Sequence, residues 1–262
     1  MDLALKHKLA LVTGSTAGIG FAIAAALANE GARVIVNGRT QAAVDAAVAK
    51  LKSNGAEILG FAGDLTTSAA AEQLAERHPN VEILVNNLGI FEAVPFEEIT
   101  DAHWVRFFEA NVLSGVRLAR LYLPAMKRAN WGRIIFISSE SAVQIPAEMI
   151  HYGMTKTAQL AVARGLAESL AGTGVTVNSV LPGPTKSRGV NDFVDTFAKA
   201  EGKSFDEFEH EFFEKIRPTS LIKRFAAPEE VASLVAYVAS PLASATTGAA
   251  LRVDGGVIKS AF

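Results

Sequence analysis

Short apolar runs rich in β-branched residues alternate along the chain with alanine-rich segments of helical spacing. The runs lack a polar–apolar alternation, which is typical of strands buried on both faces, and they cover residues 9–13, 33–37, 57–62, 81–86, 133–138, 175–180 and 250–253. The segments between them have apolar residues three and four positions apart and predict helices at 19–29, 41–52, 68–78, 101–127, 152–171 and 228–239. Seven strands with interposed helices predict an α/β fold: a doubly wound parallel sheet with helices on both faces and right-handed crossovers.

The stretch from Pro182 to Pro228 interrupts this alternation, because it shows no strand pattern. Its phenylalanines are spaced three or four apart within two groups and predict two short amphipathic helices: Phe193 and Phe197, then Phe205, Phe208 and Phe212. The pattern fits an ordinary pair of surface helices, but long excursions in compact domains often cover ligand sites. Because no linker or repeat divides the chain, we predict a single domain spanning residues 1–262, with a helical lid over residues 187–227.

Composition narrows the classes of protein that this pattern allows. Of the 262 residues, 50% are hydrophobic and 20% are charged, which excludes intrinsic disorder. The formal net charge of −2 argues against nucleic acid as a partner, and the absence of cysteine excludes disulfides, thiolate metal sites and a cysteine nucleophile. The sequence shows neither a signal peptide nor an uncharged apolar run of about 18 residues, so we expect a cytoplasmic protein without a membrane span.

A glycine-rich loop follows the first predicted strand and opens the first predicted helix. Its residues are Gly14, Ser15, Thr16, Ala17, Gly18, Ile19 and Gly20. Glycine permits backbone angles and a close ligand approach that other residues prevent, and a helix N-terminus offers free N–H groups to a phosphate. Many strand–helix turns contain glycines without binding a ligand, but a position on the first strand of an alternating pattern favours a phosphate-binding loop.

The ends of the second and third strands carry candidate cofactor contacts. Arg39 follows Gly38 at a position where an acid would bind a ribose 2′-hydroxyl, and a basic side chain there can instead pair with a 2′-phosphate. A solvated arginine at the start of a helix would produce the same sequence. Asp64, followed by Leu65, could accept a hydrogen bond from an adenine amino group or cap the next helix.

Tyr152 and Lys156 are four residues apart and share one face of a predicted helix. A nearby ammonium stabilises a phenolate and lowers its pKa, so that a tyrosine can exchange a proton with a substrate oxygen. Such a pair is common by chance. Ser139, at the end of the fifth strand, could hold the same oxygen, and Asn111 lies inside a predicted helix, where asparagine is mildly unfavourable.

In order and spacing these motifs resemble the short-chain dehydrogenase/reductase family, in its compact one-domain branch with a Rossmann-like sheet. The glycine loop matches the family's nucleotide loop, and Ser139 precedes Tyr152 by 13 residues, as is usual in the family. The segment Asn86-Asn87-Leu88-Gly89 resembles the family's Asn-Asn-Ala-Gly motif, with leucine in place of alanine. A later loop resembles the one that holds the nicotinamide carboxamide and contains Pro182, Gly183, Thr185 and Ser187.

The resemblance implies a direct hydride transfer between a nicotinamide and a carbonyl or alcohol carbon, with no metal. Ser139 would orient the substrate oxygen, Tyr152 would exchange its proton, and Lys156 would lower the pKa of Tyr152 and hold the nicotinamide ribose. Asn111 would anchor a water molecule that links Lys156 to solvent. Ser138 competes with Ser139 for its role, and the spacing favours Ser139.

The resemblance also bears on cofactor, assembly and substrate. Arg39 favours NADP(H), while the neutral glycine loop remains compatible with NAD(H), and the family implies a homotetramer. Apolar residues before Tyr152 predict an apolar ketone or alcohol as substrate: Ile145, Pro146, Met149 and Ile150. The layout also resembles 3-oxoacyl carrier-protein reductases, which implies a 3-oxoacyl thioester. A non-catalytic dinucleotide-binding sensor on the same fold is the alternative function, although it would not need the three catalytic candidates together.

Overall fold

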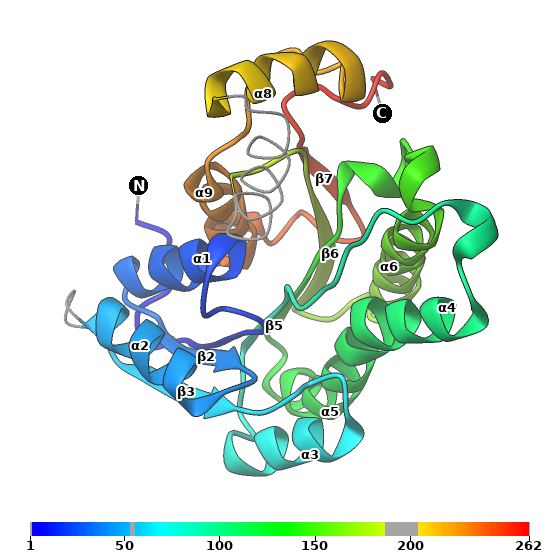
Figure 1. Ribbon diagram of the computed structural model, residues 1–262. Helices are drawn as coiled ribbons and strands as arrows, with labels where there is room; N and C mark the ends of the chain where they lie inside the picture. The colour runs from blue at the N-terminus through cyan, green and yellow to red at the C-terminus, as the bar shows by residue number, and fades with distance from the viewer. Residues whose placement is uncertain (1, 53–55, 187–203, 262) are drawn as a thin grey trace.

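Seven strands form one sheet in the computed structural model, which describes residues 2–52, 56–186 and 204–261 (Figure 1). They are β1 (Leu9–Val12), β2 (Arg33–Gly38), β3 (Ile58–Ala62), β4 (Ile83–Asn86), β5 (Gly132–Ile137), β6 (Val175–Pro182) and β7 (Ala250–Val253). All neighbouring pairs are parallel, in the order β3-β2-β1-β4-β5-β6-β7. The prediction of a doubly wound, Rossmann-like sheet is confirmed. In such sheets ligands bind beyond the carboxyl ends of the strands, where the strand order reverses, here between β1 and β4.

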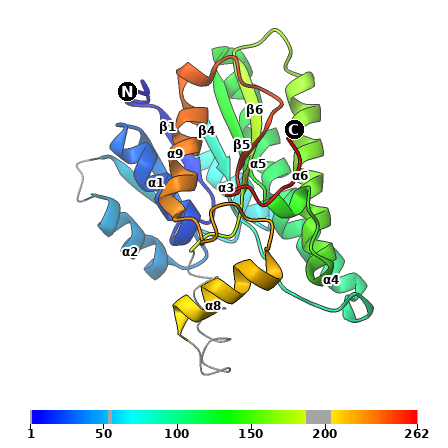
Figure 2. The same cartoon turned by 90° about the horizontal axis from the view of Figure 1, so that it is seen from above.

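Helices cover both faces of the sheet, as Figure 2 shows. One face packs on α1 (Gly18–Asn29), α2 (Gln41–Lys52) and α9 (Pro228–Ala239), and the other on α3 (Ser68–Arg77), α5 (Ser114–Ala129) and α6 (Ile150–Glu168). Strand β1 serves both cores, because Ala10 and Val12 lie in the first and Leu9 and Leu11 in the second. This two-sided burial explains the unbroken apolar runs in the sequence.

The predicted helix 101–127 is divided by a wider turn. It consists of α4 (Asp101–Phe108), the π-helical turn η2 (Glu109–Leu113) and α5. The turn contains Asn111, whose backbone carbonyl accepts a hydrogen bond from Nε2 of Gln159 in α6. A π turn inserts an extra residue and is frequent at functional sites. This departure from the predicted helix therefore supports Asn111 as a candidate functional residue.

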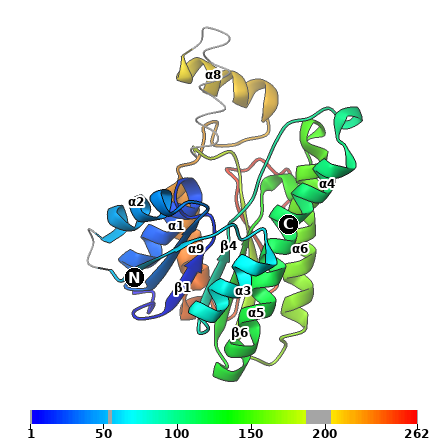
Figure 3. The ribbon, with the colours of Figure 1, turned by 60° about the horizontal axis from the view of Figure 1, so that its bottom comes forward.

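The excursion after β6 contains α8 (Phe205–Glu211), which continues into the π-helical turn η5 (Phe212–Ile216). Figure 3 shows α8 standing off the end of the sheet, away from the helices that cover its faces. Phe208, Phe213 and Phe225 form a small core of their own there. The second predicted helix of the excursion is therefore confirmed, while Phe193 and Phe197 lie outside the described residues. The lid and the single-domain boundary stay predictions.

Within the described parts of the chain, no helix is long and apolar enough to cross a membrane.

Candidate active site

The glycine loop between β1 and α1 is shaped for close approach by a ligand. Gly18, the first residue of α1, has a φ of 58°, in the left-handed region that favours glycine. A Cβ at Gly20 would lie 2.5 Å from both the carbonyl oxygen of Gly14 and Nδ2 of Asn87. Ala17 precedes α1 without a capping side chain, so the first N–H groups of the helix remain available to a phosphate. The loop therefore fits the phosphates of a dinucleotide.

Neighbouring strand ends hold this loop in place. Asn37 of β2 accepts a hydrogen bond at Oδ1 from the N–H of Gly14 (3.1 Å), and Nδ2 of Asn87 donates to the carbonyls of Thr13 (2.9 Å) and Gly14 (3.1 Å). The hydroxyl of Ser15 donates to the carbonyl of Val12. The side chains of Ser15 and Asn87 thus support the loop.

The candidate nucleotide-selecting residues lie at the ends of β2 and β3. Arg39 is exposed and forms no ion pair with the described residues. Thr16 packs closely on Gly38, because a Cβ added at Gly38 would lie 2.5 Å from Cγ2 of Thr16. Leu65 is buried. Asp64 accepts hydrogen bonds from the N–H and hydroxyl of Thr66. The suggestion that Asp64 caps the next helix is wrong.

The cap of α3 is Thr67, whose hydroxyl accepts a hydrogen bond from the N–H of Ala70 (3.3 Å). Asp64 forms a tight local turn three residues earlier instead, and its exposed carboxylate remains compatible with an adenine contact.

Asn111, Gly89 and Lys156 meet where β4 ends. A Cβ at Gly89 would lie 3.3 Å from Oδ1 of Asn111 and 3.4 Å from Nζ of Lys156. Asn111 accepts a hydrogen bond from the N–H of Ile90 (2.7 Å) and donates to the carbonyl of Ile90 (3.0 Å). The absent side chain of Gly89 thus allows the loop after β4 to lie against both candidate catalytic groups.

Lys156 is buried in α6, and its Nζ donates to the carbonyl of Ile137 at the end of β5 (2.9 Å). Nζ lies 5.6 Å from the ring centroid of Tyr152, one helical turn earlier. The hydroxyl of Ser138 donates to the backbone carbonyl of Lys156 (2.9 Å), whereas the side chain of Ser139 interacts with that of Tyr152 and lowers its pKa. Ser138 therefore has a supporting role, and the position of Ser139 agrees with the choice made from the spacing.

The pKa of Tyr152 is raised in the structure, whereas the sequence predicted that Lys156 would lower it. Burial raises the pKa of Tyr152 to about 12, and hydrogen bonding to Ser139 opposes part of that rise. Burial also lowers the pKa of Lys156 to about 7. The loss of water around the phenolate outweighs the neighbouring charges, so Tyr152 is a protonated phenol at neutral pH.

The end of β6 supplies the last group of predicted residues. A Cβ at Gly183 would lie 2.5 Å from the carbonyl oxygen of Asp254, so only glycine fits between β6 and the turn after β7. Thr185 is buried, and its hydroxyl donates to the carbonyl of Gly183 (2.9 Å). Pro182 closes β6, and Ser187 lies outside the described residues.

The predicted residues thus gather at the carboxyl ends of β1, β2, β3, β4, β5 and β6. Sequence reasoning missed the supporting role of Asn37, although a polar residue at the end of a buried strand was a signal for it.

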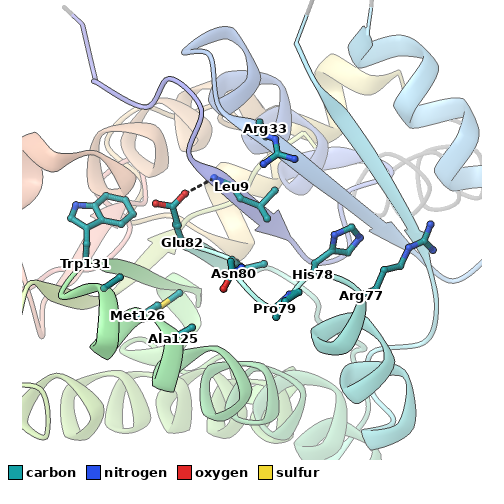
Figure 4. Close-up of a pocket in the computed structure, with 12 residues that line it drawn as sticks. Leu9, Arg33, Arg77, His78, Pro79, Asn80, Glu82, Ala125, Met126 and Trp131 are labelled. Carbon is teal, nitrogen blue, oxygen red and sulfur yellow. Dashed lines mark hydrogen bonds between the residues drawn. The ribbon is translucent and has the colours of Figure 1, made fainter.

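A cavity of about 500 Å³ lies at the opposite end of the sheet, lined in part by Leu9, Glu82 and Trp131 (Figure 4). None of the predicted site residues lines this cavity.

Comparisons with known proteins agree with this arrangement. A model of the family described as short chain dehydrogenase matches residues 8–196. The chain is 49% identical to the uncharacterized oxidoreductase YvaG of Bacillus subtilis over the full length of both chains. It is 32% identical to 3-oxoacyl-[acyl-carrier-protein] reductase FabG of Aquifex aeolicus, covering 98% of this chain and 100% of that protein. L-sorbose reductase from Gluconobacter frateurii, solved with NADPH and L-sorbose, is 31% identical with a TM-score of 0.93, covering 99% of this chain and 100% of that one.

Proposed function

Because the chain belongs to the short-chain dehydrogenase/reductase family, we propose that it is an NADP(H)-dependent oxidoreductase that interconverts a carbonyl and an alcohol. The observation that carries the proposal is the meeting of Ser139, Tyr152 and Lys156 at the carboxyl end of β5. A sensor that only bound a dinucleotide would need the glycine loop but not this constellation.

The choice of NADP(H) is supported at the adenosine end of the site. The solved L-sorbose reductase binds NADPH, and this chain places the exposed Arg39, rather than an acid, at the end of β2. The loop around Gly18 and the start of α1 would hold the pyrophosphate through backbone N–H groups. Lys156 and the β6 loop at Gly183 would hold the nicotinamide half.

The residues of this chain supply positioning and a proton, while NADP(H), when bound, supplies or accepts the hydride. The hydroxyl of Ser139 orients the substrate oxygen, and the O–H of Tyr152 donates a proton to that oxygen as the carbonyl is reduced. The pKa of Tyr152, raised by burial to about 12, keeps this phenol protonated at neutral pH, so that it holds a proton to donate. Asn111 keeps the loop after β4 against Lys156.

The substrate side of the site is apolar. Phe91 packs edge-on against Tyr152, with ring centroids 6.4 Å apart, and Ile145 lies against Gly153 one residue beyond it. Phe91 and Ile145 are both about half exposed, so each offers apolar surface next to the phenol. These walls support an apolar ketone or alcohol, or the acyl chain of a 3-oxoacyl thioester.

We also propose a homotetramer, because apolar side chains remain exposed on two separate parts of the surface. Val105 on α4 is 61% exposed, and Tyr237 and Leu242 are exposed near the end of α9. Sedimentation at micromolar concentration would show a tetramer, and a monomer would contradict the proposal.

The decisive experiment mixes the protein with NADPH and a panel of small ketones, bulky ketones and 3-oxoacyl thioesters, and follows NADPH absorbance. Tyr152→Phe should abolish turnover while NADPH fluorescence still reports binding, because the change removes only the proton donor. Retained turnover in Tyr152→Phe would refute the mechanism. Tight NADPH binding without turnover of any compound would favour the non-catalytic sensor.

A further inference from the structure

A buried ion pair joins the residue after Ser139 to the end of the α8 segment. Nε of Arg217 donates to Oε1 of Glu140 across 3.1 Å, and the two side chains are only 9% and 5% exposed. Glu140 opens the short helix η3 (Glu140–Ala142), and Arg217 directly follows η5. The pair therefore links the loop of a candidate catalytic residue to residues 205–216.

The same guanidinium also reaches the loop that leads to Tyr152. Nη1 of Arg217 lies 3.4 Å from Oε1 of Glu148, in the short helix η4 (Ala147–Met149) just ahead of α6. One arginine thus contacts both carboxylates that bracket residues 140–148. The planar fork of arginine suits such a double contact, whereas lysine offers a single point charge.

Stability alone does not account for this pair. The cost of burying two charges roughly cancels their attraction, and replacing such a pair by apolar groups is often neutral or stabilising. Oε2 of Glu140 is buried and has no hydrogen-bond partner among the described residues, and burial raises the pKa of Glu140. A costly pair beside the site indicates that its position matters.

We propose that Glu140 and Arg217 are positioning residues that hold two apolar walls of the substrate pocket at a fixed separation. One wall is the loop after Ser139, where Val143 and Ile145 are about half exposed, and the other is the end of η5, where Ile216 is similarly exposed. The inference rests on the proposed function and deepens it, since it makes the fit of bulky apolar ketones depend on this pair.

The test compares wild type with Glu140→Gln, Arg217→Met and the double variant that combines them. Each single change leaves an uncompensated buried group, so these variants should lose stability, whereas the double variant removes both charges and should regain it. Arg217→Lys tests whether charge alone is sufficient. Lys215→Met is the matched control, because it deletes an exposed lysine, paired with Glu211, from the same segment.

We expect the double variant to have a Tm near that of wild type. Its KM for the bicyclic ketone decalone should rise about tenfold or more, with a smaller rise for cyclohexanone. Arg217→Lys should not restore the KM for decalone, because it reaches only one carboxylate. Lys215→Met should match wild type with both ketones. Unchanged KM values in the double variant, or an equal loss of kcat with both ketones, would overturn the positioning role.

Hydrogen exchange separates this inference from the proposed function, because it needs no turnover. Residues 141–148 and 205–216 should exchange faster in the double variant and at the wild-type rate in Lys215→Met. Unchanged exchange in the double variant would overturn the inference. If wild type reduces neither ketone while exchange still accelerates, the proposed function fails for these substrates and the link between the two segments stands.

Discussion

The side-chain amide of Asn111 donates a hydrogen bond to the hydroxyl of Thr155 across 2.9 Å, which joins the π turn η2 to α6. The same amide donates to the carbonyl of Ile90 (3.0 Å), while its oxygen accepts from the N–H of Ile90 (2.7 Å). Thr155 precedes Lys156, and Gly89 next to Ile90 lies against Nζ of that lysine. Asn111 therefore clamps the loop after β4 and α6 around Lys156.

Replacing this clamp should impair both turnover and stability. Asn111→Leu leaves the N–H and carbonyl of Ile90 without their partner, and we expect the free energy of unfolding to fall by about 1–3 kcal/mol. A displacement of Lys156 should lower kcat by about a hundredfold. Thr155→Val, which removes one bond of the clamp, is the milder control. Wild-type kcat in a folded Asn111→Leu protein would contradict the clamp.

The parts of the site that sequence could predict depend on short-range geometry. A glycine loop between a strand and a helix, and a tyrosine and lysine one turn apart, have nearly the same relative positions in any such fold. Ser139 could be placed because parallel strands present their carboxyl ends at one edge of the sheet. The structure brings these residues together as expected.

The remaining features depend on contacts between distant parts of the chain. Asn37 supports Gly14 from 23 residues away, and Arg217 meets Glu140 across 77 residues, so no local pattern identifies the partner in either contact. The direction of the Tyr152 pKa was predicted wrongly for a related reason. Spacing shows that Lys156 is near, but the depth of burial, which dominates the pKa, is a property of the whole fold.

The glycine loop makes a separate prediction about cofactor binding. In Gly20→Ala the new methyl group would lie 2.5 Å from the Gly14 carbonyl and from Nδ2 of Asn87, so the loop must shift. We expect NADPH affinity to fall by about tenfold or more, measured by fluorescence titration. Gly165→Ala in α6, where a Cβ would meet nothing within 4 Å, is the matched control and should bind NADPH like wild type.

Arg39 should decide between the two nicotinamide cofactors. Because it is exposed and unpaired among the described residues, Arg39→Asp should remove a partner of the 2′-phosphate without disturbing the fold. We expect NADPH to bind about tenfold or more weakly and NADH to bind more tightly, as judged by Kd values at one ionic strength. If NADPH affinity is unchanged and NADH binding stays weak, the role given to Arg39 is wrong.

His151 should be replaceable despite its position next to Tyr152. Its ring is fully buried, 4.1 Å from the ring centroid of Phe107, and neither ring nitrogen has a hydrogen-bond partner in the described structure. Burial lowers the pKa of His151, so wild type loses stability as pH falls below about 6.5, where the unfolded chain gains a proton first. His151→Phe should be at least as stable at neutral pH and lose this dependence. A loss of more than about 1 kcal/mol at pH 7 would contradict the packing role.

Lys156 should leave a pH signature on stability that is independent of activity. Its pKa, lowered by burial to about 7, compares with about 10.4 in an unfolded chain. Between these values the unfolded chain binds a proton that the folded protein does not, so stability rises with pH, and the penalty is full below about pH 7. Lys156→Met removes this dependence. The stability of Lys156→Met relative to wild type should therefore be greatest near pH 6 to 7 and fall by about a few kcal/mol toward pH 10.

Denaturant unfolding at several pH values would measure this difference directly. The series should stop at about pH 10, because the raised pKa of Tyr152 makes wild type lose stability above that point. Lys215→Met, which removes an exposed lysine, is the control and should differ from wild type by a nearly constant amount across the series. A difference between Lys156→Met and wild type that does not change with pH would show that Lys156 remains charged in the folded protein at pH 10, contrary to its burial beside Ile137.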